Sequence, residues 1–196
     1  MEKRVPFVKG HGTQNDFVLL PDPDGLLLPD LDAATVRRLT DRHTGLAADG
    51  VIRVVRSAAL DADADLLADA EWFMDYRNAD GSVAEMCGNG VRVMARYLWS
   101  AGLAHGRELP IGTRGGLRLV HAESDLLYTV DMGRPEAMPT SGPVRVTARR
   151  AVFEAVAIRA PNPHAVVFVD DLLRAPNGKL YRVSLKAVAF ESVRGA

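Results

Sequence analysis

Cys87 is the only cysteine in this sequence, and it stands in a segment whose residue types suit proton transfer. Residues 78–82 read Asn-Ala-Asp-Gly-Ser, and residues 85–90 read Glu-Met-Cys-Gly-Asn-Gly. Glycines let backbone N–H groups approach a ligand closely, and the positive end of a helix dipole favours an anion such as a carboxylate. Thiols at a helix N-terminus also ionise more readily. With a helix following it, the segment predicts a thiolate base beside a carboxylate-binding turn.

A structural role for Cys87 is the alternative, because a lone cysteine in a cytosolic protein is usually a small buried apolar residue. The Gly-Asn-Gly turn that follows favours the chemical role, since such a turn serves no packing purpose after a core residue. A single thiol forms no internal disulfide. Because no cysteine or histidine partner accompanies it at metal-binding spacing, the sequence predicts no metal site.

A helix is predicted over residues 88–101, directly after the cysteine. Its apolar stripe at helical spacing consists of Val91, Met94, Ala95 and Leu98. Arg92 and Arg96 lie off this stripe, and Gly102 supplies a stop signal. This helix would hold the thiol at its N-terminus.

Most of the remaining pattern is typical of strands, with apolar stretches interrupted by Gly, Pro, Asn and Asp. The clearest strand candidates are residues 51–55, 117–120, 127–130 and 165–169. A second helix is predicted over residues 32–42 with Asp32 as its N-cap, and residues 58–70 are expected to form a surface loop. The pattern pauses near residue 133, which predicts a first lobe over residues 1–133 and a second over 134–196.

Composition narrows the function classes. The chain has 196 residues, 47% of them hydrophobic and 25% charged, and 24 basic against 25 acidic residues give a net charge of -1. This balance provides no basic patch for nucleic acid or for an anionic membrane surface. No stretch approaches the roughly 20 apolar residues of a spanning helix, and the first residues lack the apolar core of a signal peptide. We therefore expect a cytoplasmic protein without nucleic-acid or membrane partners.

Two long motifs resemble those of diaminopimelate epimerases. Residues 78–92, Asn-Ala-Asp-Gly-Ser-Val-Ala-Glu-Met-Cys-Gly-Asn-Gly-Val-Arg, resemble the motif around the first catalytic cysteine of that family, and residues 7–17 resemble its N-terminal strand and loop. Shorter matches follow in family order at residues 48–50, 113–116, 131–133 and 162–164. The resemblance covers about residues 5–170.

The resemblance implies epimerisation at the α-carbon of diaminopimelate, from the LL to the meso form, in lysine and peptidoglycan precursor biosynthesis. Enzymes of this family use no pyridoxal phosphate or other cofactor, and a homodimer is the expected assembly. Two cysteines face opposite sides of the α-carbon, because inversion by proton transfer needs removal on one face and return on the other. By this resemblance Cys87 is one acid/base, with His164 as nearby support. The substrate-binding residues that it implies are Gly88 and Asn89 for the α-carboxylate, and Asn15, Asn78 and Asn162 for the other polar groups.

Each of these assignments has a structural alternative. Asn15, Asn78 and Asn162 stand where the backbone turns, and asparagine is favoured there without any ligand. His164 opens an apolar stretch, where a hydrogen-bonded structural histidine is as common as a proton carrier. His11 lies between Gly10 and Gly12, which suggest a tightly packed loop, so it is not placed in the site.

The sequence departs from the family after residue 171. It has no second cysteine and no Ala-Cys-Gly-Thr-Gly loop, and residues 175–196 resemble nothing in the family. Pro161 stands where glycine is usual, and Gln14 stands where glycine is common. A truncated or frame-shifted chain, a partial chain and a complete protein that has lost racemisation all fit this pattern. The second lobe is therefore expected to be incomplete, with an atypical C-terminal tail.

The apolar face of the 88–101 helix and the resemblance together predict an α/β (α+β) fold. In it, a mostly antiparallel sheet curls around this central helix. Two functional alternatives stay open. One is a related two-cysteine racemase such as a proline-racemase-like enzyme, and the other is a truncated, non-catalytic chain that only binds an amino acid.

Overall fold

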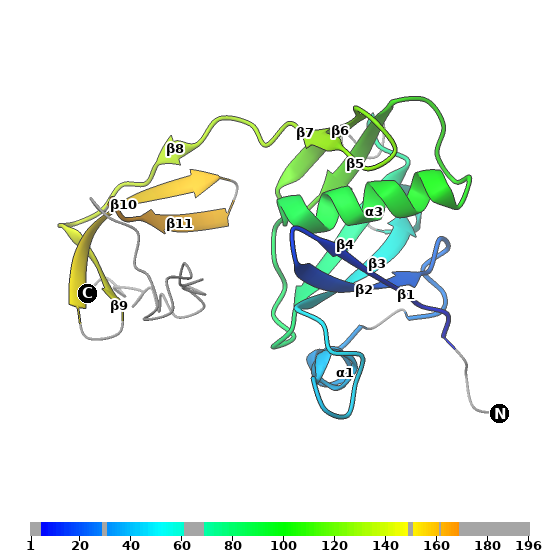
Figure 1. The fold of residues 1–196 in the computed structure, drawn as a ribbon, viewed down its shortest axis with the longest axis horizontal. Coiled ribbons are helices and arrows are strands. Elements are labelled where there is room, and N and C mark those ends of the chain that lie inside the picture. Colours follow the sequence, from blue (N-terminus) through cyan, green and yellow to red (C-terminus); the bar gives the residue numbers. More distant parts are fainter. Residues whose placement is uncertain (1–4, 29–30, 61–68, 149–150, 161, 169–196) are drawn as a thin grey trace. The chain divides into compact units, whose positions relative to one another are not determined.

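The computed structural model describes residues 5–28, 31–60, 69–148, 151–160 and 162–168. The chain forms two compact units, residues 1–133 and 134–196, called here the first and second units (Figure 1). No helix in the described ranges is long and apolar enough to cross a membrane. Each unit is built around its own sheet.

The first unit holds a seven-stranded sheet whose strands are neighbours in chain order. The strands are β1 (Val8–Gly12), β2 (Asn15–Pro21), β3 (Gly50–Arg56), β4 (Trp72–Asn78), β5 (Glu108–Thr113), β6 (Gly116–Ala122) and β7 (Tyr128–Val130). Four neighbouring pairs are antiparallel, and two, β2–β3 and β4–β5, are parallel. The prediction of a mostly antiparallel sheet is confirmed. The strands predicted over residues 51–55 and 117–120 fall within β3 and β6, and the strand predicted over residues 127–130 begins one residue before β7.

Each parallel pair requires a crossover connection, and a helix occupies each crossover. Helix α1 (Ala33–Thr40) lies between β2 and β3, and α3 (Gly88–Ser100) lies between β4 and β5. Asp32 is the N-cap of α1, as predicted, and accepts from the Thr35 N–H at 2.6 Å. The helix ends two residues earlier than predicted, because the Asp41 carboxylate accepts from the N–H groups of His43 and Thr44 and turns the chain away.

Helix α3 lies against the concave side of the sheet. It contacts both edge strands, β1 and β7, as well as strands between them, so the sheet curls around it as predicted (Figure 1). The buried residues of the helix are Gly90 and the four residues of the predicted stripe, Val91, Met94, Ala95 and Leu98. Gly102 follows with φ +68°, a conformation that costs glycine little and ends the helix.

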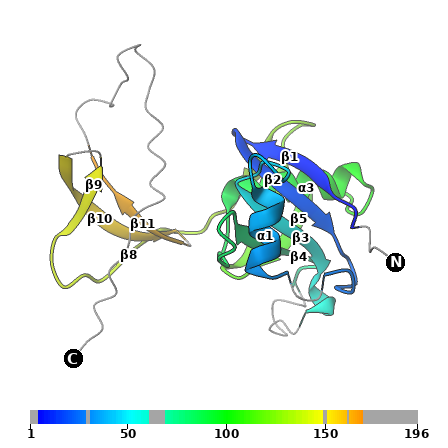
Figure 2. The ribbon, with the colours of Figure 1, turned by 90° about the horizontal axis from the view of Figure 1, so that it is seen from below.

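Strands β2 and β3 are buried on both faces. Their alternating side chains separate into two clusters: Phe17 and Ile52 pack with α3, whereas Val18 and Val51 pack with Val36 of α1. Figure 2 shows α1 in front of these strands. The buried residues of β2, residues 17–20, form a continuous apolar run, as expected for a strand covered on two sides, whereas β3 is interrupted by the buried Arg53.

The loop predicted over residues 58–70 is described only in part. A short 3₁₀ helix, η1 (Ser57–Ala59), follows β3 directly. Residues 61–68 lie outside the described part of the chain.

In the second unit, β10 (Ala151–Ala160) pairs antiparallel with β8 (Glu136–Ala137), β9 (Val144–Ala148) and β11 (Asn162–Val166). The strand predicted over residues 165–169 was placed too late, because β11 begins at Asn162 and residue 169 lies outside the described residues. The polar Asn-Pro-His start suggested a loop. It nevertheless pairs with β10, as a proline can where its missing N–H is not needed by the ladder.

The two-residue turn of the β1–β2 hairpin holds two residues other than glycine in a strained backbone conformation. Thr13 and Gln14 have φ values of 52° and 61°, which define the left-handed turn that joins the paired residues Gly12 and Asn15. Because a side chain disfavours this region by about 1–2 kcal/mol, Gln14→Gly is expected to raise the free energy of unfolding by about 1 kcal/mol. Urea denaturation measures it. Ser124→Gly, at a loop residue without positive φ, is the control and should not stabilise; a Gln14→Gly variant less stable than the parent would contradict the prediction.

Candidate active site around Cys87

Cys87 is the N-cap residue of α3. Its backbone is extended, with φ −143° and ψ 113°, and its carbonyl accepts the first helical hydrogen bond from the Val91 N–H at 2.9 Å. The half-buried thiol is free and makes no capping bond to the helix. The structure thus places the thiol at the positive end of the helix, beside the first-turn N–H groups that have no partner within the helix itself.

Asn15 presents its amide oxygen to this thiol. The Asn15 Nδ2 donates to Asp49 Oδ2 at 2.9 Å, and the Asp16 N–H donates to the same oxygen at 3.0 Å. Because an ionised carboxylate only accepts, this contact fixes the amide with its nitrogen toward Asp49. The Asn15 Oδ1 then lies 4.0 Å from Cys87 Sγ, as the acceptor of the thiol. The other Asp49 oxygen pairs with Arg42 at 2.8 Å.

Asn78 is held from both sides at the end of β4. The Tyr76 hydroxyl donates to Asn78 Oδ1 at 3.0 Å, and Asn78 Nδ2 donates to Ser82 Oγ at 3.0 Å. The Ser82 hydroxyl in turn donates to Asp80 Oδ1 at 2.6 Å. The predicted turn over residues 78–82 is therefore an ordered hydrogen-bonded unit beside the site.

The Tyr76 phenol is hydrogen-bonded to Asn78 and interacts electrostatically with Cys87. Burial raises the pKa of Tyr76 far above its ordinary value, and negative charges at Cys87, Asp49 and Asp80 raise this pKa further. The phenol consequently stays protonated and acts as a hydrogen-bond donor to Asn78. Its ring also packs on Gly50, where a Cβ would come within 2.6 Å of the ring.

The Gly88-Asn89-Gly90 turn is enclosed by the β1–β2 hairpin. Arg92 donates to Asn89 Oδ1, to the Gly88 carbonyl at 3.2 Å and to the Thr13 hydroxyl at 3.0 Å. A Cβ on Gly12 would come within 2.9 Å of the Asn89 carbonyl oxygen, so only glycine fits there. The tight packing predicted around His11 is confirmed at this glycine, but the predicted loop is wrong, because His11 lies in strand β1 and pairs with Asp16.

Asn162 and His164 belong to β11 in the second unit, which is described by itself. Asn162 pairs with Ala160 in the ladder, and His164 Nε2 lies 3.2 Å from the Ala160 carbonyl oxygen. The residues that the structure brings together around the thiol are Asn15, Asn78, Gly88 and Asn89. A site role for Asn162 and His164 stays a prediction.

Sequence reasoning missed three residues that shape this site: Asp49, Tyr76 and Arg92. Tyr76 precedes Asn78 by two positions, so strand alternation places both on one face of β4. This spacing could have predicted from the sequence that Tyr76 lies beside Asn78. Asp49 lies in the Ala-Asp-Gly match but is 34 residues from Asn15, a separation that no local pattern bridges. In the described residues no cluster of three His, Cys, Asp or Glu side chains could hold a metal ion.

Two solved structures that share this fold are an epimerase and a probable racemase. A hydroxyproline epimerase from Agrobacterium vitis aligns with a TM-score of 0.61 at 12% identity, covering 85% of this chain and 52% of that one. A probable proline racemase from Agrobacterium radiobacter aligns with a TM-score of 0.58 at 12% identity, covering 84% of this chain and 52% of its own. At such low identity the likeness establishes the fold alone.

Sequence comparison is more specific. The family model described as diaminopimelate epimerase matches residues 7–138. The diaminopimelate epimerase of Streptomyces coelicolor is 51% identical over 181 residues, which are 92% of this chain and 61% of the relative. That of Thermobifida fusca is 56% identical over 162 residues, covering 81% of this chain and 57% of the relative. The chain belongs to the diaminopimelate epimerase family, as its motifs predicted, and spans about three fifths of the length of these curated relatives.

Proposed function

We propose that this chain carries the first half-site of a diaminopimelate epimerase, in which Cys87 transfers the α-proton on one face of the substrate. The observation that carries the proposal is the position of the thiol, at the N-terminus of α3 and 4.0 Å from the Asn15 amide oxygen. Membership of the family supports diaminopimelate as the substrate.

The geometry supports a division of roles. The N–H groups of Gly88 and Asn89, at the positive end of α3, would bind the α-carboxylate and stabilise the negative charge that develops when the proton leaves. The Asn15 amide offers an oxygen at the thiol, so it suits an ammonium donor better than a carboxylate. Asn78 and Asn162 would bind the remaining polar groups, with His164 as support. No cofactor enters this scheme.

Inversion requires a second acid on the opposite face of the α-carbon. Cys87 is the only cysteine among the 196 residues, so these residues supply no second thiol for that role. A chain that binds an amino acid without racemising it is the second candidate function. The pathway in lysine and peptidoglycan synthesis, the cytoplasmic location and the homodimer are parts of the same proposal, and light scattering after gel filtration tests the dimer.

The proposal is tested by incubating the intact chain with LL-diaminopimelate in D2O. NMR follows loss of the α-proton, and chiral chromatography follows the isomers, beside a protein-free control. Exchange with inversion supports a complete epimerase with a second acid of another type. Exchange without inversion supports a half-site with a one-face base. Binding without exchange supports the amino-acid-binding chain. If the chain neither binds diaminopimelate nor exchanges its α-proton, the proposal is overturned.

Asp49 is expected to be essential for orienting Asn15. Asp49→Asn replaces an acceptor-only group with one that also donates, so the Asn15 amide is no longer fixed with its oxygen toward Cys87. A misplacement of about 1 Å costs up to roughly 10²-fold, so we expect α-proton exchange to fall at least about 10-fold. Arg42→Gln is the matched control, because it removes the exposed partner of Asp49 and leaves the Asn15 contact. Equal exchange rates in Asp49→Asn and Arg42→Gln would contradict this role.

A further inference from the structure

The β5–β6 turn, residues 113–116, is bonded to the segment that carries Cys87. The Gly115 N–H donates to the Glu85 carbonyl at 3.0 Å, two residues before the cysteine. The buried Thr113 hydroxyl shapes this turn, since it donates to the Gly116 carbonyl at 2.6 Å and accepts from the Gly115 N–H at 3.1 Å, a donor that it shares with the Glu85 carbonyl. The turn therefore aims one backbone donor at the catalytic segment.

Arg114 anchors the turn to β4. Its Nη2 donates to Asp75 Oδ1 at 2.6 Å, and its guanidinium lies 5.8 Å from the centre of the Phe73 ring. Arg114 side-chain exposure is 31%, against 1% for Asp75. The anchor on Asp75 is thus removed from solvent.

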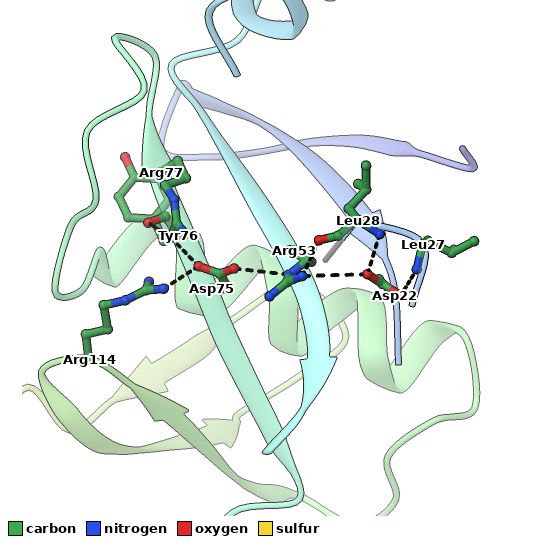
Figure 3. Close-up of polar contacts among 8 residues, drawn as sticks. All are labelled: Asp22, Leu27, Leu28, Arg53, Asp75, Tyr76, Arg77 and Arg114. Atoms are coloured by element: carbon green, nitrogen blue, oxygen red, sulfur yellow. Dashed lines mark hydrogen bonds and ion pairs between the residues drawn. The ribbon is translucent and has the colours of Figure 1, made fainter. Parts of the chain in front are cut away.

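Asp75 is itself immobilised on this face of the sheet (Figure 3). Arg53 Nε donates to its second oxygen at 3.0 Å, and Arg77 donates to the oxygen that Arg114 shares. Arg53 also donates to the Leu28 carbonyl and lies 3.8 Å from Asp22, which accepts from two backbone N–H groups. Shifting a buried carboxylate with this many charged donors is costly, so the anchor is rigid.

The segment between β4 and α3 links the turn to the thiol along the chain. Met86 is 1% exposed and packs in the main core of the first unit, directly between Glu85 and Cys87. Because Cys87 is the N-cap of α3, a shift at Glu85 would move the thiol relative to the helix end and to Asn15. The chain of contacts runs from Asp75 through the turn to Cys87.

We infer that Arg114 is a positioning residue for Cys87, acting through the Gly115–Glu85 hydrogen bond. This inference rests on the proposed function, because it takes Cys87 as the reacting group. It adds which residues hold the thiol in position. Without Arg114, Asp75 keeps Arg53 and Arg77 as partners, so the chain should still fold while the turn loosens.

The test compares Arg114→Met with Arg114→Lys and with Arg56→Met as matched control. Arg56 likewise pairs with carboxylates and lies over an aromatic ring, at 5.3 Å from the Trp72 ring centre, but its contacts are with Asp24 and Glu71. In Arg114→Met, we expect kcat for α-proton exchange to fall about 10-fold with KM nearly unchanged, because only alignment is lost. Arg114→Lys should recover part of the lost kcat, and Arg56→Met should have the kcat of the parent.

Hydrogen exchange of the backbone separates this inference from the proposed function. The Gly115 amide and the amides of residues 83–87 should exchange faster in Arg114→Met than in the parent or in Arg56→Met, whether or not the chain turns over diaminopimelate. If Arg114→Met folds poorly, the same comparison is made with Arg114→Lys. Parent-like amide exchange in the folded Arg114 variants, or a parent-like kcat in an active chain, overturns the inference.

Discussion

Replacing Cys87 with alanine is expected to lower the rate of α-proton exchange by about 10²- to 10⁴-fold, the range over which a positioned acid–base group contributes. The substitution removes the sulfur that faces Asn15 Oδ1 at 4.0 Å and leaves the backbone of α3 unchanged. Binding of diaminopimelate should persist, because the proposed carboxylate contacts are backbone N–H groups of Gly88 and Asn89. Catalysis and binding are thus expected to separate in this variant.

NMR in D2O measures the exchange, and calorimetric titration measures the binding. Cys87→Ser is the companion variant, because its hydroxyl keeps the size and polarity of the side chain but is a far weaker acid. Circular dichroism and thermal unfolding should show both variants folded like the parent, since the thiol makes no capping bond to α3. Retention of exchange in folded Cys87→Ala would assign the base to another group and remove the central claim of the proposal.

The parts of the site that could be predicted from sequence are those set by local interactions. The 88–101 helix follows from the spacing of its apolar stripe, and the thiol at its N-terminus follows from the Cys-Gly-Asn-Gly order. The Asp32 cap is equally local, because donor and acceptor are three residues apart. Such features need no knowledge of the sheet.

The parts that could not be predicted depend on strands meeting across the sheet. Asp75 and Arg53 are 22 residues apart, and a charged residue in a strand ordinarily indicates a solvent-facing side. Here both are buried, at 1% and 6% exposure, because they satisfy one another. Strand β11 could not be predicted fully for the same reason. Asn162 and Pro163 belong to a strand only because they pair with β10.

Replacing Asp75 with alanine is expected to lower the free energy of unfolding by about 3–5 kcal/mol, the cost of breaking a buried ion pair from one side. Arg53 would remain buried, with Asp22 3.8 Å away as its nearest carboxylate. Arg77 and Arg114 are partly exposed and can turn toward water, so most of the loss should come from Arg53. Urea denaturation, followed by the fluorescence of the two tryptophans, Trp72 and Trp99, measures the change.

Two comparisons identify the cause. Asp24→Ala removes a carboxylate that is 73% exposed and 3.6 Å from Arg56, and should change stability by no more than about 1 kcal/mol. The double variant Arg53→Met with Asp75→Leu should be less destabilised than Asp75→Ala, because neither Arg53 nor Asp75 is left buried without the other, and the buried Asp22 keeps its two backbone N–H donors. A double variant as unstable as the sum of its single changes would refute this account. The result also bears on the site, because Asp75 and Tyr76 are adjacent on β4 and face opposite sides of the sheet. Asp75 stabilises the strand on one face, and on the other face the Tyr76 hydroxyl donates to Asn78.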